Sequence, residues 1–227
     1  MALVSFVRRG VVALLVAAVA PLALATAAVA ADAPQTLVVA YVETPASGAA
    51  TAERRLQDYA AQLRKSSGAP SVEVLHEIGR PQRMAVIERW AADAVPADGA
   101  LQKMFDGKLQ APVDRRAHKP IGPLLTKGGP FHMLMHVDVV PAGAEMATKA
   151  LDALRTAVMA APGALGYELA VQPDRANHFA IHETWASRAA YEAYAASPAE
   201  QQLRAQLATV KGALFDDRFY VAAGQGK

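Results

Sequence analysis

Two stretches of the chain show the same succession of hydrophobic and polar positions. The apolar runs LVVAYVE (37–43) and HMLMHVDVV (132–140) are each followed by a segment with apolar residues at helical spacing. Those residues are Ala52, Leu56, Tyr59 and Leu63 in the first stretch and Ala147, Leu151, Leu154 and Val158 in the second. One apolar stripe at this spacing predicts an amphipathic helix with one buried face. Gly68 and Gly163 follow where a residue with left-handed backbone would end each helix.

After each predicted helix, two further apolar runs flank a short polar turn. The first runs are SVEVLHEI (71–78) and GYELAVQ (166–172), the turns are GRPQ and PDRAN, and the second runs are RMAVIERW (83–90) and HFAIHETW (178–185). This pattern predicts β-hairpins. Each stretch therefore reads as strand, helix, strand and strand.

The segments after the two tryptophans differ in regularity. In Ser197-Pro198-Ala199-Glu200, the serine, proline and glutamate fit the start of a helix. One helix is expected to end near Ala196, another to begin at Pro198, and a last strand to cover DDRFYVAA (216–223). The equivalent part of the first stretch, GALQKMFDGKLQ followed by VDRRAHKPIGPLL, is shorter and less regular.

The two stretches align without a gap, residues 37–93 over 132–188, with the offset that separates Trp90 from Trp185. Identical residues along the alignment include Val42 and Val137, Leu56 and Leu151, Glu73 and Glu168, Ala85 and Ala180, Glu88 and Glu183, and the two tryptophans. Matches spread over a whole unit indicate an internal duplication.

The repeat predicts the fold class. The order strand-helix-strand-strand-helix-strand is the split βαβ, ferredoxin-like arrangement, whose two helices cover one sheet face only. The strands are apolar on both faces, which indicates burial on both sides. We therefore predict an α+β protein: two tandem ferredoxin-like repeats packed sheet to sheet as an intrachain dimeric α/β barrel. The first repeat covers residues 36–124, a linker 125–130, and the second repeat 131–224.

The N-terminal segment predicts export. Residues 1–30 combine Arg8 and Arg9, an apolar run interrupted by Pro21, and an Ala-Val-Ala cleavage pattern, which is the layout of a secretory signal peptide. A twin-arginine signal is the alternative to the general route. The expected location is periplasmic or secreted, with no membrane attachment after cleavage.

Charge and cysteine content narrow the class further. Without Arg8 and Arg9 the chain has 21 basic and 21 acidic residues, a balance that argues against nucleic acid as a partner. The absence of cysteine excludes disulfides, thiol catalysis and thiolate metal sites. The sequence also has no GxGxxG, Walker or GxSxG motif.

Several motifs resemble the antibiotic-biosynthesis monooxygenase (ABM) domain family of dimeric α/β barrels. They are HVDVVP (136–141), the Glu-x-Trp strand end, WASRAAYEAYAASPA (185–199) and FDDRFY (215–220), with MAVIERW and DRRAHKP as weaker versions in the first repeat. The resemblance implies an oxygenase that needs no prosthetic group, with molecular oxygen as co-substrate, although it leaves a flavin or a metal ion open. Tyr194 stands where many members have a histidine. The Asn, Trp and His set of the haem-degrading branch is absent.

The duplication serves as an internal control for the candidate residues. Glu183 and Trp185 recur as Glu88 and Trp90, which indicates a structural role, with a cation such as Arg218 as partner of Glu183. The histidines do not recur: His132, His136, His178 and His182 align with Leu37, Tyr41, Arg83 and Ile87. His136 and His182 are expected to lie diagonally adjacent on neighbouring strands. We assign them as proton acceptor and partner, with a buried histidine satisfied by a backbone carbonyl or a tyrosine as the alternative.

The remaining assignments concern the pocket and its ligand. Tyr167, Trp185, Tyr191, Tyr194 and Arg218 are the expected substrate-binding residues around a slot for a flat aromatic molecule. A cation held by His132, His136, His182 and Asp138 is a less favoured alternative, and no metal is assigned. The predicted function is an exported ABM-type monooxygenase acting on a quinol-like or phenolic compound. The alternative is a non-catalytic ligand-binding or stress-related barrel; whether the pseudo-dimer pairs further stays open.

Overall fold

The computed structural model describes residues 35–66, 71–91, 95, 99–105 and 107–224, all within one compact unit, Asp32–Lys227. The predicted signal peptide and Gly68 lie outside the described residues. The first repeat contains β1 (Gln35–Glu43), α1 (Ala49–Leu63), β2 (Ser71–Glu77), β3 (Arg80–Ala91), α2 (Ala100–Met104) and β4 (Asp114–Pro120). The second contains β6 (Phe131–Asp138), α3 (Ala144–Ala160), β7 (Ala164–Gln172), β8 (Arg175–Trp185), α4 (Arg188–Ala195), α5 (Pro198–Ala208) and β9 (Asp216–Ala222).

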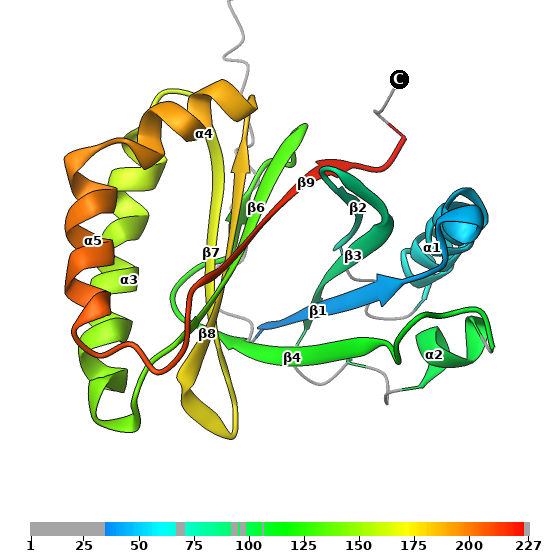
Figure 1. Ribbon diagram of the computed structural model, residues 1–227, viewed down its shortest axis with the longest axis horizontal. Coiled ribbons are helices and arrows are strands. Elements are labelled where there is room, and N and C mark those ends of the chain that lie inside the picture. The colour runs from blue at the N-terminus through cyan, green and yellow to red at the C-terminus, as the bar shows by residue number, and fades with distance from the viewer. Residues whose placement is uncertain (1–34, 67–70, 92–94, 96–98, 106, 225–227) are drawn as a thin grey trace, which may run out of the picture. The chain divides into compact units, whose positions relative to one another are not determined.

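The predicted order of strands and helices is confirmed in both repeats (Figure 1). A two-residue strand, β5 (Leu125–Thr126), lies within the segment predicted as a linker and pairs with β7. Ser197 caps α5 through its side chain, which accepts a hydrogen bond from the Glu200 amide, and Pro198 occupies the first turn. Gly163 has the predicted left-handed backbone, with a φ of +85°, but it does not end α3: Ala161, in extended conformation, follows the helix, and Gly163 turns the chain into β7.

Each repeat forms a four-stranded antiparallel sheet with ferredoxin-like strand order, β4-β1-β3-β2 in the first and β9-β6-β8-β7 in the second. The two sheets join at both edges, because β2 pairs with β9 and β4 pairs with β7. Eight strands therefore close into a barrel, which leaves β5 as an addition on β7. Closure removes the free sheet edges that each repeat would otherwise expose.

The two seams between the repeats have equivalent registers. At one seam Leu75 pairs with Ala222, and at the other Ala170, the equivalent of Leu75, pairs with Pro120. The ladders within the repeats agree as well, since both hairpins shift register just before the turn, after His76 and after Val171. Exchange of the two repeats thus reproduces the strand pairing, which is the relationship that a local twofold axis produces.

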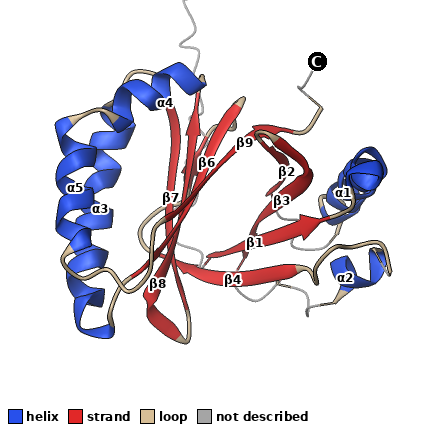
Figure 2. Cartoon of the chain, viewed as in Figure 1, coloured by secondary structure: helices blue, strands red, loops and turns tan. Residues whose placement is uncertain are grey.

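The helices cover the outer faces of the two sheets, α1 and α2 on the first and α3, α4 and α5 on the second (Figure 2). Each outer face packs a separate hydrophobic core against its helices. A third, smaller core fills part of the barrel interior and combines both repeats: Leu37, Val39, Leu75, Ala85, Ile87, Leu134, Ala170 and Tyr220. Side chains that alternate along a strand therefore enter either a helix-covered core or the barrel interior.

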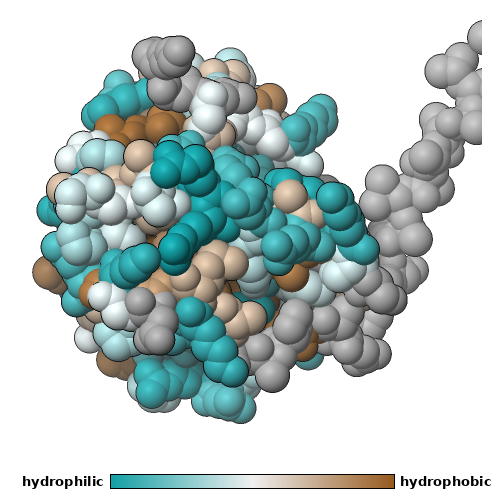
Figure 3. Space-filling model, turned by 90° about the vertical axis from the view of Figure 1, so that its right-hand side faces the viewer, coloured by the Kyte–Doolittle hydropathy of each residue, from teal (hydrophilic) through white to brown (hydrophobic). Residues whose placement is uncertain are grey.

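The surface that carries α1 and α2 is mainly hydrophilic, with apolar side chains in small separate areas (Figure 3). Among the described helices, none combines the length and the hydropathy that crossing a membrane requires.

Candidate functional site

The polar residues of the barrel interior form two clusters. The first, the His132–His182 cluster, comprises His132, His182, Glu168, Arg89 and Glu73. His182 lies between the other members: its Nε2 is 3.0 Å from His132 Nδ1, and its Nδ1 is 2.7 Å from Glu168 Oε2. Arg89 binds both oxygens of Glu168, at 2.5 and 2.6 Å, and Glu73 at 2.8 Å. Strands of both repeats thus supply this cluster.

The hydrogen bonds of this cluster fix where its protons lie. The carbonyl oxygen of Gly129 can only accept, so His132 Nε2, at 2.8 Å, donates to it. His132 Nδ1 then accepts from His182 Nε2, while His182 Nδ1 faces the Glu168 carboxylate and donates there. The cluster thus combines the Arg89 guanidinium and two hydrogen-bonded histidines with the carboxylates of Glu73 and Glu168.

The pKa values in the cluster follow from burial and from these charges. Burial, and then the charge of His182, lower the pKa of His132 to about 4, which keeps this ring neutral. Burial raises the pKa of Glu168, but the Arg89 charge and the hydrogen bond from His182 outweigh it and lower the value to about 2. Arg89 likewise lowers the pKa of Glu73 against the effect of burial.

The second cluster is built around a contact between the repeats. Tyr41 on β1 and His136 on β6 meet with 2.5 Å between the phenol oxygen and His136 Nε2. The Arg218 guanidinium lies 4.6 Å from the centre of the Tyr41 ring and binds Asp216 at 2.5 Å. His118, buried on β4, has its ring centre 6.5 Å from that of His136.

Burial also sets the ionisation of this second cluster. It lowers the pKa of His136 to about 4, with the positive charge of Arg116 as the next cause. It raises the pKa of Tyr41, and the influence of Tyr220 acts in the same direction. A neutral imidazole therefore faces a protonated phenol, and Tyr41 donates the hydrogen bond to His136.

A cavity of about 200 Å³ opens beside this pair, with Tyr41, Arg218, Tyr220 and Asp114 among its lining residues. Its counterpart in the other repeat, a cavity of about 540 Å³, is lined by residues that include Arg116, Asp138 and His178. The two cavities share an ion pair at equivalent positions, Arg83 with Glu43 at 3.0 Å and His178 with Asp138 at 2.9 Å. The Tyr41 cavity differs in having in its wall a tyrosine that is hydrogen-bonded to a histidine of the other repeat.

The register confirms that His136 and His182 lie diagonally on neighbouring strands, since His136 faces Ala180. The expected contact between the two histidines is wrong, however. His182 bonds to His132 and Glu168, and His136 bonds to Tyr41 across the barrel. Asp138, considered as a metal ligand with them, pairs with His178 instead.

The expected aromatic slot does not share a face with the histidines. Trp185, Tyr167, Tyr191 and Tyr194 belong to the core beneath the helices of the second repeat, on the outer face of its sheet. Their rings pack on each other, with Trp185 and Tyr194 centres 5.2 Å apart, and the Tyr167 hydroxyl donates to Leu151 O at 2.7 Å. Only Arg218 of the proposed binding residues accompanies His136. The substrate-binding role of the other four stays a prediction.

The carboxylates of the two Glu-x-Trp motifs differ in their partners. Both accept a hydrogen bond from the following tryptophan, at 2.6 Å for Glu88 and 3.0 Å for Glu183. Glu88 also pairs with Arg115 at 3.0 Å, whereas Asp217 occupies the equivalent position of β9. The expected pairing of Glu183 with Arg218 is wrong, because Arg218 faces the opposite side of the sheet and binds Asp216. Burial, and then the Glu200 charge, raise the pKa of Glu183 to about 8.

The largest of the described cavities lies at the seam between β2 and β9. It has a volume of about 840 Å³ and a largely apolar wall that includes Ile78, Phe131 and Val221. His76, paired with Glu53 at 3.3 Å, adds polar groups to this wall. Such a volume suits a small organic ligand.

The sequence pattern missed Tyr41, Arg89, Glu73 and Glu168 as members of the interior clusters. The recurrence of the two glutamates was a signal, but it equally fits a structural role. Arg89 aligns with Thr184 and gave no signal. Contacts across the barrel depend on the closure of the two sheets, which periodicity within one strand does not specify.

The comparisons with known proteins agree with the fold. Residues 130–206, most of the second repeat, match the family model described as antibiotic biosynthesis monooxygenase. The first repeat completes the tandem pseudo-dimer that forms the barrel. A comparison with curated protein sequences finds no match.

Solved structures with this fold span both repeats. A putative monooxygenase from Fusobacterium nucleatum is 10% identical with a TM-score of 0.71, and covers 84% of this chain and 93% of its own. A putative monooxygenase from Lactobacillus acidophilus is 15% identical with a TM-score of 0.64, covering 83% and 94%. An anthrone oxidase-like protein is 12% identical with a TM-score of 0.64, covering 85% and 92%. At these identities the likeness shows a common fold.

Proposed function

We propose that the protein is an exported oxygenase that acts, without a prosthetic group, on a small phenolic or quinol-like molecule bound in the Tyr41–Arg218 cavity. The observation that carries this proposal is the hydrogen bond between Tyr41 and His136 at the wall of a cavity that also contains a guanidinium. The ABM match of the second repeat supports the reaction class. The description of one structural neighbour as anthrone oxidase-like supports an aromatic substrate.

The chemistry begins with removal of a phenolic proton. The substrate hydroxyl passes its proton to the Tyr41 oxygen, while Tyr41 passes its own proton to His136 Nε2. Arg218 stabilises the resulting phenolate by its positive charge. The electron-rich ring then reduces molecular oxygen: one oxygen atom enters the ring to give a quinone, and the other leaves as water with two substrate hydrogens.

The cavity limits the substrate to a small molecule. Its volume of about 200 Å³ lies below the range of about 300–1,000 Å³ that is usual for sites of drug-sized ligands. We therefore favour one or two rings over the larger polycyclic compounds. Export follows from the signal-peptide pattern at residues 1–30, and a periplasmic or secreted location would be tested by cell fractionation.

The decisive test is oxygen consumption with a panel of one- and two-ring phenols and hydroquinones. We expect turnover by the wild-type protein and a reduction of about 10²–10⁴-fold in His136→Phe, which removes the proton acceptor. His178→Ala, in the equivalent cavity of the other repeat, is the matched control and should keep the wild-type rate. Absence of turnover with the whole panel, or an unchanged rate in folded His136→Phe, would remove the enzymatic proposal.

The alternative function, binding of a lipophilic ligand without catalysis, has an observation of its own in the apolar seam cavity of about 840 Å³. Ile78 is 37% exposed at its wall, so Ile78→Glu places a charge there without disturbing a core. Loss of binding of a fluorescent apolar probe in this variant, with oxygen consumption absent throughout, would favour the binding module.

A further inference from the structure

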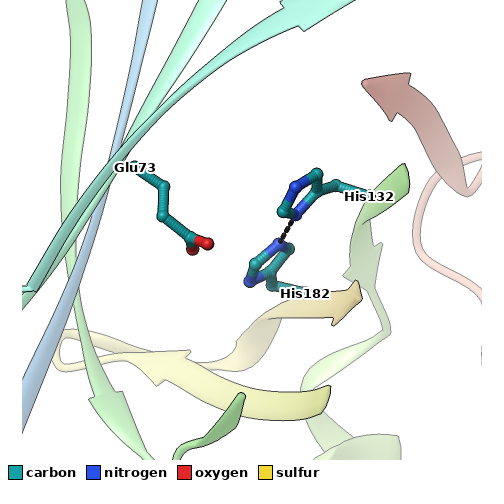
Figure 4. A group of neighbouring side chains, drawn as sticks. All are labelled: Glu73, His132 and His182. Carbon is teal, nitrogen blue, oxygen red and sulfur yellow. Dashed lines mark hydrogen bonds between the residues drawn. The ribbon is translucent and has the colours of Figure 1, made fainter. Parts of the chain in front are cut away.

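Three potential metal ligands converge inside the barrel, from β2, β6 and β8. The ligand atoms of Glu73, His132 and His182 all lie within 4.8 Å of one another. Figure 4 shows the Glu73 carboxylate extending from its own strand toward the two imidazoles, which face each other across their hydrogen bond. The rings are nearly parallel, 7° apart, and both are fully buried. We propose that these three residues bind one divalent transition-metal ion between the two repeats.

The outer nitrogens of both histidines are already held in the manner of metal ligands. His132 Nε2 donates to the Gly129 carbonyl at 2.8 Å, and His182 Nδ1 donates to Glu168 at 2.7 Å. Histidines that bind metals usually donate their second N–H to a carbonyl or carboxylate in this way, which fixes the tautomer and directs the other lone pair at the ion. The inner nitrogens, His132 Nδ1 and His182 Nε2, are thus the atoms left for a ligand.

Binding of an ion between these inner nitrogens replaces the hydrogen bond that joins them. Two nitrogens at about 2.0–2.1 Å from a tetrahedral ion lie about 3.3 Å apart, against the present 3.0 Å. The two nitrogens must therefore separate by a few tenths of an ångström, and the rings must turn so that both lone pairs are directed at the ion.

The fixed charges around the site favour a cation. Glu73 and Glu168 contribute two negative charges, and Arg89 contributes one positive charge. Arg89 binds Oε2 of Glu73, while Oε1 has no hydrogen bond from any described residue. Glu73 can therefore bind a metal through Oε1 and keep its pair with Arg89.

The donor set selects the class of ion. Two imidazoles and one carboxylate suit Zn²⁺, Co²⁺, Ni²⁺, Cu²⁺ or Fe²⁺, whereas Mg²⁺ and Ca²⁺ prefer oxygen ligands only. Comparison of equivalent positions in the two repeats distinguishes the histidine ligands from residues that both repeats share. Glu73 and Glu168 occur in both repeats, but His132 and His182 replace Leu37 and Ile87. The site therefore combines two histidines that occur only in the second repeat with Glu73, a carboxylate of the first repeat.

Titration of the untagged, metal-stripped full chain with Zn²⁺ and Co²⁺ tests this site. Calorimetry should give one ion per chain. Co²⁺ should give the visible absorption of a tetrahedral nitrogen and oxygen site. Failure of either ion to bind, or a stoichiometry other than one ion per chain, would overturn the proposal, and neither readout depends on oxygenase activity.

Variants locate the ion. Glu168→Gln, which alters the partner of both His182 and Arg89, should weaken binding about 10–100-fold. Glu73→Gln and His132→Ala should weaken it at least as much. His178→Ala and His76→Ala are controls that leave the wild-type affinity, because neither contacts this cluster. Circular dichroism of each variant establishes folding, and unchanged affinity in folded Glu73→Gln and Glu168→Gln would refute the assignment.

Discussion

Tyr41 and His136 occupy equivalent positions of the two repeats, 95 residues apart, and are joined directly by a hydrogen bond of 2.5 Å. A residue can contact its own counterpart only where the two repeats approach their local symmetry axis. Because one counterpart is a tyrosine and the other a histidine, the contact joins a hydroxyl donor to an imidazole acceptor. Two identical subunits, with tyrosine or with histidine at both positions, would form such a pair less readily. Duplication within one chain thus permits a polar pair at a position where a homodimer has two identical side chains.

The first prediction concerns the strength of this pair. Tyr41→Phe leaves the buried His136 nitrogen without its donor and should reduce the free energy of unfolding by about 1–3 kcal/mol. A double-mutant cycle with His136→Phe should give an interaction energy of about 0.5–3 kcal/mol by denaturant unfolding. Tyr194→Phe is the matched control, because the Tyr194 hydroxyl is buried without a hydrogen-bond partner among the described residues, and its removal should cost nothing. Additive effects of Tyr41→Phe and His136→Phe would contradict the contact.

The second prediction compares the two Glu-x-Trp motifs. Glu88→Gln removes the charge of Glu88 from its buried pair with Arg115 and should cost more than about 1 kcal/mol. Glu183→Gln removes no such pair, because Asp217 occupies the position equivalent to Arg115, and should change stability by less than about 1 kcal/mol at neutral pH. Urea unfolding of both variants is the measurement. Equal costs would show that the two carboxylates are electrostatically equivalent.

Much of this fold follows from patterns within single strands and helices. The helical stripes at Leu56 and Leu151, the hairpins and the start of α5 at Pro198 all depend on local spacing, and the alignment of the repeats reinforced the stripes and the hairpins. The ferredoxin-like order then followed from the order of elements. The two seams also required knowledge of how both sheets meet, which local spacing does not contain.

The candidate site was harder to predict, for two physical reasons. His182 and Trp185 are three residues apart on β8, and the two-residue period of a strand places them on opposite faces. This two-residue period alone indicates that His182 and Trp185 do not line the same slot. The partners of the histidines, Tyr41 for His136 and Glu168 with Arg89 for His182, come from neighbouring strands or from the other repeat, and their side-chain contacts depend on the closed barrel.

The third prediction uses two glycines with similar backbone conformations. Gly163, with a φ of +85°, and Gly79, with a φ of +78°, both lie in the left-handed region. Alanine at either position should cost about 1–2 kcal/mol through this conformation alone. At Gly163 the added carbon would also lie 2.7 Å from the Ala190 side chain, whereas at Gly79 it would meet nothing within 4 Å. Gly163→Ala should therefore lower the melting temperature more than Gly79→Ala. Equal shifts in melting temperature would show that α4 moves away from the added carbon without loss of stability.

The fourth prediction concerns acid sensitivity and His118. This side chain is 1% exposed, neither ring nitrogen has a hydrogen-bond partner in the described part of the chain, and burial lowers its pKa from 6.5 to about 4. Between these values the unfolded chain binds a proton that the folded protein does not, so stability is lost as the pH falls from about 6.5 to about 4.

The slope from one such group approaches about 1.4 kcal/mol per pH unit. His118→Leu removes this contribution to the pH dependence of stability. The contribution of Glu183 has the opposite sign and that of His136 the same sign, but both are present in the variant and in the wild type. They therefore cancel when the two proteins are compared. The free energy of unfolding of His118→Leu minus that of the wild type should therefore increase steadily as the pH falls below 6.5. Urea unfolding at steps of half a pH unit measures this difference. Parallel curves from pH 7 to pH 4 would mean that His118 accepts its proton as readily in the folded protein as in the unfolded chain.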